Sequence, residues 1–122
     1  YVEIARNAGA GETLDRIIPE IYNEAMFPGT AMLYSFPSYV YSLWQEYSVE
    51  ELEYIASFCK EKGIPAATVY WEYWPEETEK IFEKNGISLY VYTVNDRDQA
   101  RRYISQGAEG ICTDFLTAED LW

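Results

Sequence analysis

Short apolar runs alternate with longer amphipathic segments along the chain, and this alternation restricts the fold more than any other feature of the sequence. Residues 64–71 and 87–94 are the clearest apolar runs, and a charged segment opened by Pro75 separates them. Strands that alternate with helices pair in parallel and are connected by right-handed crossovers. The sequence therefore predicts an α/β fold with a parallel sheet, forming one domain or part of one.

The expected strands are residues 1–4, 30–36, 64–71, 87–94 and 110–113. The expected helices are residues 12–27, 37–47, 49–61, 75–84 and 96–106, followed by a helical turn from Thr117. Two of these helices have capping signals at their start. Ser48 opens a capping box in the sequence SVEE, and Asn95 can cap the helix that follows it.

The composition excludes several classes of function. The 122 residues include no His, so imidazole catalysis and His metal ligands are absent. A net charge of −12 repels nucleic acids and anionic membrane surfaces, and no apolar run approaches the roughly 18 residues of a membrane span. Twelve Tyr and four Trp favour an aromatic pocket or an interface. Cys112 lies in an apolar run, which predicts a buried thiol rather than a nucleophile.

The strongest motif is in residues 85–114, which read NGISLYVYTVNDRDQARRYISQGAEGICTD. It contains Tyr92-Thr93-Val94-Asn95 at the end of an expected strand and closes with the run from Gly107 to Asp114. This segment resembles the ending of the glycerophosphodiester phosphodiesterases, in which a strand reading WTVN is followed by a helix and then by GvdGiiTD. The resemblance implies the end of a parallel (β/α) barrel of the TIM type.

Two upstream segments extend the resemblance over nearly the whole chain. Leu33-Tyr34-Ser35-Phe36 resembles the family's isSF strand, and Tyr1-Val2-Glu3-Ile4 resembles its EiK strand, whose Glu helps to hold a divalent metal ion. Since a whole barrel needs roughly 250 residues, residues 1–122 are expected to be the C-terminal half of one, within a longer protein. The resemblance implies that Glu3 is a metal ligand. The alternative is an ordinary strand-end carboxylate that faces solvent.

The family reaction is the metal-dependent hydrolysis of glycerophosphodiesters to glycerol 3-phosphate and an alcohol, in which histidines move protons. The two catalytic histidines and the remaining metal carboxylates belong to the first half of the family's barrel. Ala5 stands where the family has the Lys of EiK. The chain alone is therefore expected to be inactive. It is also expected to hold no Ca²⁺ or Mg²⁺ tightly, because one carboxylate cannot supply the several oxygen ligands that these ions take.

Substrate-binding residues are expected among the aromatic residues near strand ends. Tyr92 replaces the Trp of WTVN, Trp71 ends the strand 64–71, and Phe36 closes the segment that resembles isSF. Packing in the core is the alternative for Tyr92 and Trp71. Because parallel strands run in one direction, Tyr92 and Glu3 are expected at the same end of the sheet.

Two hypotheses about function remain open from the sequence. In the first, the chain is the C-terminal half of a phosphodiesterase that is active only with its N-terminal half. In the second, it is a half-barrel binding or scaffold module that has lost the chemistry. In both, strand edges and one sheet face stay uncovered, so a homodimer or pairing with the missing N-terminal half is expected.

Overall fold

The computed structural model describes residues 1–74 and 76–121 and shows a single five-stranded sheet. The strands are β1 (Glu20–Ile21), β2 (Val40–Leu43), β3 (Ala66–Tyr70), β4 (Ser88–Tyr92) and β5 (Gly110–Ile111). They lie in the order β1-β2-β3-β4-β5, and each neighbouring pair is parallel. The predicted α/β fold with a parallel sheet is confirmed.

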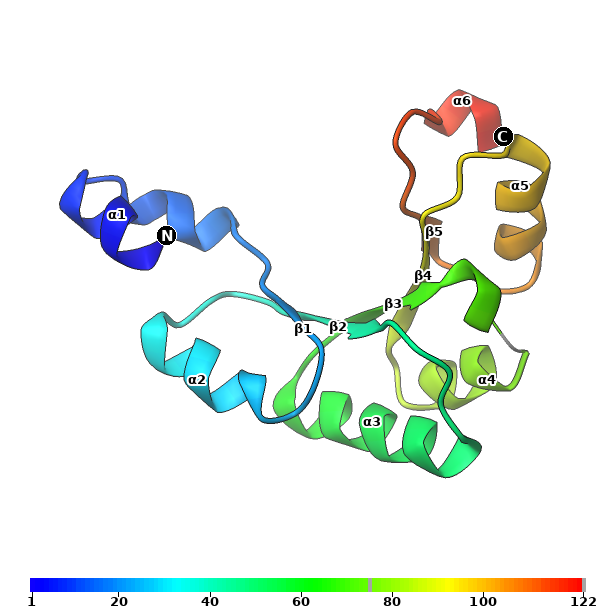
Figure 1. Cartoon of the computed structure of the whole chain (residues 1–122), viewed down its shortest axis with the longest axis horizontal. Helices are drawn as coiled ribbons and strands as arrows, with labels where there is room; N and C mark the ends of the chain where they lie inside the picture. The colour runs from blue at the N-terminus through cyan, green and yellow to red at the C-terminus, as the bar shows by residue number, and fades with distance from the viewer. Residues whose placement is uncertain (75, 122) are drawn as a thin grey trace.

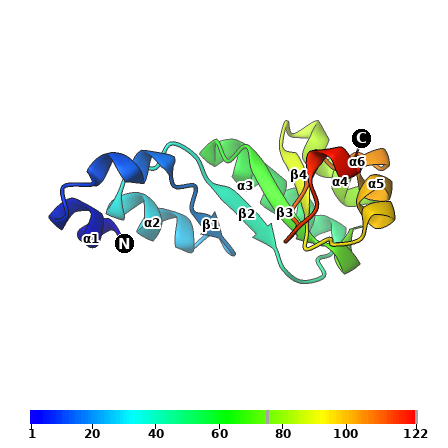
Figure 2. The same cartoon turned by 90° about the horizontal axis from the view of Figure 1, so that it is seen from above.

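The helices lie mainly on one side of this sheet. They are α1 (Val2–Asn7), α2 (Met26–Leu33), α3 (Val49–Lys62), α4 (Glu76–Lys84), α5 (Arg97–Ser105) and α6 (Ala118–Leu121), with short 3-10 helices η1 (Gly11–Arg16) and η2 (Trp71–Tyr73). Helices α2 to α5 follow the convex side of the curved sheet, and the concave side is open (Figure 1). The two termini lie at opposite ends of the molecule (Figure 2). Consecutive parallel strands with helices on the outside form a segment of a TIM-type barrel.

The hydrophobic core lies between the sheet and the outer helices. In β3 and β4, the buried side chains alternate with half-buried ones, as expected for strands with one covered face. Helix α3 buries residues at positions 52, 55, 56 and 59, the spacing of one helical face. Each element therefore presents one apolar face to the core, and the other face of the sheet carries the remaining strand side chains.

The boundaries of α3 confirm the signals in its sequence. The Ser48 hydroxyl accepts a hydrogen bond from the Glu51 backbone N–H (3.3 Å), and the Ser48 N–H donates to the Glu51 carboxylate (2.7 Å). Gly63 ends the helix with φ of 68°, a conformation that glycine adopts without steric cost.

The predicted cap of α5 was wrong by one residue, because Asp96 accepts the hydrogen bond from the Gln99 N–H. Pro75 lies outside the described residues.

The expectations for the first 47 residues were wrong. Residues 1–4 belong to α1, the expected helix 12–27 is divided among η1, β1 and the start of α2, and the expected strand 30–36 overlaps α2. The expected helix 37–47 contains β2. Pro19 explains part of the error, because proline breaks a helix interior. Pro28, which directly follows the expected helix 12–27, lies in the first turn of α2, where no intrahelical N–H bond is lost.

Candidate functional site

The carboxyl ends of all five strands lie at one edge of the sheet, because every pair is parallel. The register places Ser42, Thr68 and Tyr90 side by side, and it places Tyr70 beside Tyr92 one step closer to that edge. In β3 and β4 these residues alternate with those buried under the helices, so they belong to the opposite, concave face. Ser42 is itself buried, and its hydroxyl lies next to that of Thr68. Parallel α/β barrels build their sites at this end of the strands.

A polar cluster occupies the concave face at β1, β2 and β3. The Tyr22 hydroxyl donates to Glu20 Oε2 (3.0 Å), and the Thr68 hydroxyl lies 3.3 Å from both Glu20 Oε1 and Ser42 Oγ. The hydrogen bond to Glu20 and the negative charge of that carboxylate raise the pKa of Tyr22, so Tyr22 keeps its proton. The cluster therefore presents one carboxylate whose two oxygens each have a hydroxyl neighbour.

An aromatic group lies next to this polar cluster at the ends of β3 and β4. The Tyr70 ring is 5.8 Å from the Tyr92 ring, 5.7 Å from Trp71 and 5.6 Å from Tyr73, measured between centroids. The Trp71 carbonyl accepts a hydrogen bond from the Tyr103 hydroxyl (3.0 Å), which ties the end of β3 to α5. The structure thus brings the predicted residues Tyr92 and Trp71 together at the carboxyl edge. Their role in substrate binding stays a prediction.

Two other predicted site residues lie elsewhere. Phe36 packs with Tyr34 and Tyr39, just before the start of β2, and is therefore near the opposite edge of the sheet. Glu3 is exposed on α1, so the expectation that Glu3 and Tyr92 share one end of a sheet was wrong. The error follows from assigning residues 1–4 to a strand. Arg6, next to the Ala5 that stands in place of the family's Lys, donates a hydrogen bond to the Leu33 carbonyl (3.0 Å).

The loops after β4 and β5 are held together by Asn95. Its side-chain oxygen accepts hydrogen bonds from the Thr113 hydroxyl and the Asp114 N–H, both at 3.0 Å, and its amide donates to the Asp114 carboxylate (2.7 Å). The two halves of the strongest sequence motif therefore meet in space. Their contacts fix the loops, and the carboxylate of Asp114 is engaged in a structural hydrogen bond.

Gly110 is needed because an aromatic side chain crosses its strand. A Cβ atom at this position would lie 2.7 Å from Cε1 of Tyr90, much closer than carbon atoms approach one another. The Tyr90 ring, on the concave face of β4, thus lies over β5 only because residue 110 has no side chain. This contact gives a physical reason for the second glycine of the motif.

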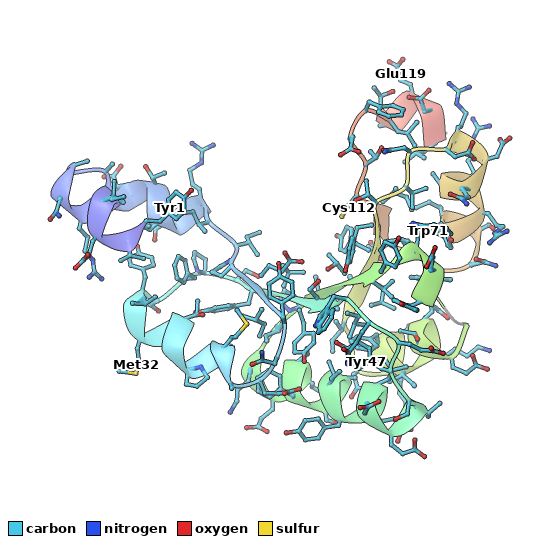
Figure 3. All side chains as sticks on the ribbon, in the orientation of Figure 1. Tyr1, Met32, Tyr47, Trp71, Cys112 and Glu119 are labelled. Carbon is cyan, nitrogen blue, oxygen red and sulfur yellow. The ribbon has the colours of Figure 1, made fainter. Side chains whose placement is uncertain are left out.

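The two cysteines differ in their exposure. Cys59 in α3 is fully buried, and this burial raises the pKa of its thiol to about 12. Cys112, which was expected to be buried, is exposed and projects from the end of β5 toward the concave side (Figure 3). Partial desolvation and the nearby Glu20 carboxylate raise the pKa of Cys112, so it is an accessible but not an activated thiol.

The described residues do not form a divalent metal site. They contain no group of three or more His, Cys, Asp or Glu side chains that could hold a metal ion. Glu20 is the one acidic residue within the five strands, and Ca²⁺ and Mg²⁺ take about six or more oxygen ligands. Glu20 alone cannot hold such an ion, and the expectation that the chain by itself binds no Ca²⁺ or Mg²⁺ tightly stays a prediction.

The polar cluster was missed by sequence reasoning. Glu20 and Tyr22 lay in a segment that was taken as helical, and Ser42 lay in another. One signal was present: in Glu20-Ile21-Tyr22 a single apolar residue is flanked by polar groups, directly after a proline, as in a strand with one covered face. For Thr68 and Tyr70, the same alternation was visible within a strand that was correctly predicted.

These features define a parallel α/β chain that forms part of a barrel and carries polar and aromatic side chains at the carboxyl ends of its strands. The model of the glycerophosphoryl diester phosphodiesterase family matches residues 29–118. The chain therefore belongs to the glycerophosphoryl diester phosphodiesterase family. A search of curated proteins found no match.

Two solved structures share the fold. A protein assigned as a glycerophosphoryl diester phosphodiesterase from Silicibacter pomeroyi is 17% identical with a TM-score of 0.69, and 93% of this chain covers 40% of that protein. A glycerophosphodiester phosphodiesterase from Parabacteroides distasonis is 19% identical with a TM-score of 0.60, and 93% of this chain covers 44% of it. The chain thus spans about two fifths of their length. None of its described helices is long and apolar enough to span a membrane.

Proposed function

We propose that this chain is the C-terminal part of a glycerophosphodiester phosphodiesterase barrel and supplies one wall of the substrate site. The hydrolytic groups then come from residues outside these 122. The observation that carries the proposal is the open concave face, which places a polar cluster and an aromatic group at the carboxyl ends of parallel strands. The parent reaction is the metal-dependent hydrolysis of a glycerophosphodiester to glycerol 3-phosphate and an alcohol.

The concave face suits the uncharged parts of such a substrate. The rings of Tyr70 and Tyr92 offer an apolar surface for glycerol or alcohol carbons, with Trp71 beside them. Hydroxyl groups of the polar cluster can exchange hydrogen bonds with glycerol. No Lys or Arg occurs within any of the five strands, so the phosphate charge has to be balanced by a metal ion or by cations from elsewhere.

The absence of cations from the strands favours a second candidate, a binding or scaffold module without chemistry. Ala5 in place of the family's Lys points the same way. The two candidates differ in what an upstream segment of the parent protein would contain. A His-Arg-Gly motif and an acidic pair support the enzyme.

Reconstitution tests the proposed function. The chain and an upstream segment encoded by the same gene, produced separately and mixed, should hydrolyse glycerophosphocholine with Ca²⁺ or Mg²⁺, while neither piece alone does so. Tyr92→Ala in the chain should reduce this activity, whereas Tyr1→Ala, which alters a fully exposed ring, should leave it unchanged. Mixed pieces that associate and remain inactive would support the scaffold and contradict the enzyme.

We further propose that the concave face is covered in solution by a second copy or by the N-terminal half. Sedimentation equilibrium should show association at moderate salt, where the repulsion between chains of charge −12 is screened. Cys112 should react with a thiol reagent in dilute protein and become protected as association proceeds. Cys59 should react only on unfolding, as an internal control. A monomer with a reactive Cys112 at high concentration would rule out the homodimer.

A further inference from the structure

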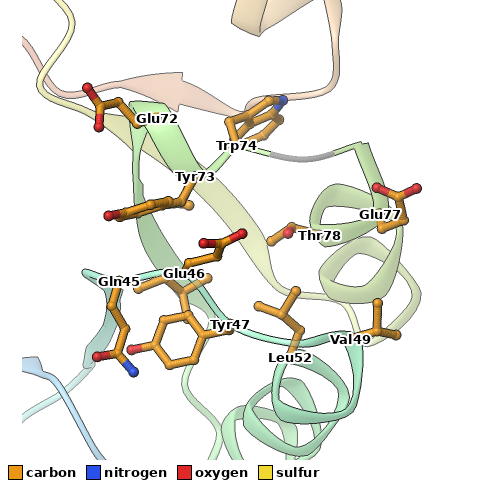
Figure 4. A pocket seen from close by; sticks show the side chains of 12 residues that line it. Gln45, Glu46, Tyr47, Val49, Leu52, Glu72, Tyr73, Trp74, Glu77 and Thr78 are labelled. Carbon is orange, nitrogen blue, oxygen red and sulfur yellow. The ribbon is translucent and has the colours of Figure 1, made fainter.

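A cavity lies between the sheet and the helices, with its floor on the side of the sheet that faces away from the concave face. Its floor includes Leu43 of β2 and Val69 of β3, whose side chains point toward the helices and are fully buried. Its walls come from the first turns of α3 and α4 and from the loops after β2 and β3 (Figure 4). The cavity has a volume of about 250 Å³, which suits a ligand smaller than the usual drug-sized molecule. We call it the α3–α4 cavity.

A buried polar group without a partner points into this cavity. Thr78 is 1% exposed, and its hydroxyl has no hydrogen-bond partner among the described residues. The side chain extends from α4 toward the cavity (Figure 4). A buried hydroxyl that lacks a partner destabilises the folded protein, and native structures contain few such groups. A ligand that hydrogen-bonds to Thr78 would remove this cost.

The other lining residues identify the charge of the ligand. Three carboxylate side chains line the cavity, from Glu46, Glu72 and Glu77, and none of its described lining residues is Lys or Arg. Such a lining repels phosphate and other anions and attracts cations. A bare metal ion is excluded as the occupant, because the described residues contain no group of three acidic or other ligating side chains able to hold one.

The aromatic residues indicate an organic cation. Tyr47, Tyr73 and Trp74 line the same cavity, and the faces of such rings attract ammonium groups. The apolar floor favours a short hydrocarbon part on the ligand. An N–H group on the cation would supply the hydrogen bond that the Thr78 oxygen lacks, which a quaternary ammonium ion cannot do.

We propose that the α3–α4 cavity binds a small organic molecule that carries a protonated primary amine. The amine lies near the Glu46 carboxylate, which points toward Thr78 (Figure 4), and it donates a hydrogen bond to Thr78 Oγ1, while its carbon chain packs on Leu43 and Val69. The cavity lies at the carboxyl edge of the sheet and shares Tyr73 with the aromatic group of the concave face. Binding of an amine there needs no hydrolytic chemistry, so the proposal does not depend on the proposed phosphodiesterase role.

Titration of the 122-residue chain with n-butylammonium, followed by amide and indole NMR signals, tests the proposal. Saturable shifts should appear at Thr78 and Trp74, and n-butanol and tetramethylammonium should bind much more weakly. Thr78→Val, which removes the hydroxyl and keeps the shape, should weaken butylammonium binding about tenfold, the loss expected for one hydrogen bond to a charged group.

Carboxylate variants provide a test that does not depend on the folding of Thr78→Val. Glu46→Gln should weaken binding several-fold, whereas Glu53→Gln, on the exposed face of α3 and outside the cavity, should not. The absence of saturable shifts with butylammonium, an equal response to butanol, or equal affinities of Glu46→Gln and Glu53→Gln would each overturn the proposal.

Discussion

Phe82→Ala should lower the free energy of unfolding by about 3–5 kcal/mol, the range measured for removal of a buried Phe side chain. Phe82 is 0% exposed and belongs to the core between the sheet and the helices. Its carbonyl also accepts the Asn85 and Ile87 N–H groups (3.0 Å each), where α4 ends and the chain turns toward β4. Because domains of this size are stable by only about 5–15 kcal/mol, a large part of the chain's stability should be lost.

Urea denaturation monitored by circular dichroism measures this effect. Phe115→Ala provides the matched control, because Phe115 is 68% exposed and its removal should change the free energy of unfolding by no more than about 0.5 kcal/mol. Equal losses for the two variants would show that α4 does not pack on the sheet as described.

The second half of the fold was predictable because several independent signals agree there. The capping box at Ser48 and Gly63 mark the two ends of α3, and the β3 and β4 runs alternate in burial with the strand period of two. These strands are each five residues long, and a register error of one residue would expose their apolar side chains. Local sequence and tertiary packing therefore favour the same structure.

The first 47 residues lacked such agreement. Strand β1 has two residues, and its pairing with β2 is set by tertiary contacts rather than by its own sequence. In the β2 region, the apolar residues at positions 39, 40, 43 and 44 fit a helical face, whereas Tyr39, Tyr41 and Leu43 fit a strand. Pairing of β2 with two neighbours decides between these patterns.

The difference between the well-marked second half of the chain and its first 47 residues also explains which site residues could be predicted. Tyr92 and Trp71 follow well-marked strands, so their place at the carboxyl edge follows from strand direction. Glu20 contacts Thr68, which is 48 residues away in the sequence. No local pattern encodes that contact, because it depends on the order β1-β2-β3 in the sheet. Glu3 was misplaced because residues 1–4 were taken as a strand.

The purified 122-residue chain should show no metal-dependent hydrolysis of glycerophosphodiesters. The chain contains no His to move protons, and its described residues bring together no metal site. Its concave face offers one acidic residue within the strands and no strand cation for the phosphate. The remaining groups match the substrate-wall role that we propose, which needs hydrolytic groups from outside the chain.

The direct test is an assay of the purified chain with glycerophosphocholine and with bis-p-nitrophenyl phosphate, with and without Ca²⁺ or Mg²⁺. Phosphodiesterases accelerate hydrolysis by at least about a millionfold, so even a small retained fraction of activity would be measurable. We expect the rate with the chain to equal the rate without it under all of these conditions. Hydrolysis that rises with Ca²⁺ or Mg²⁺, follows the 14.2 kDa protein through repurification and is lost in Tyr92→Ala would contradict this account.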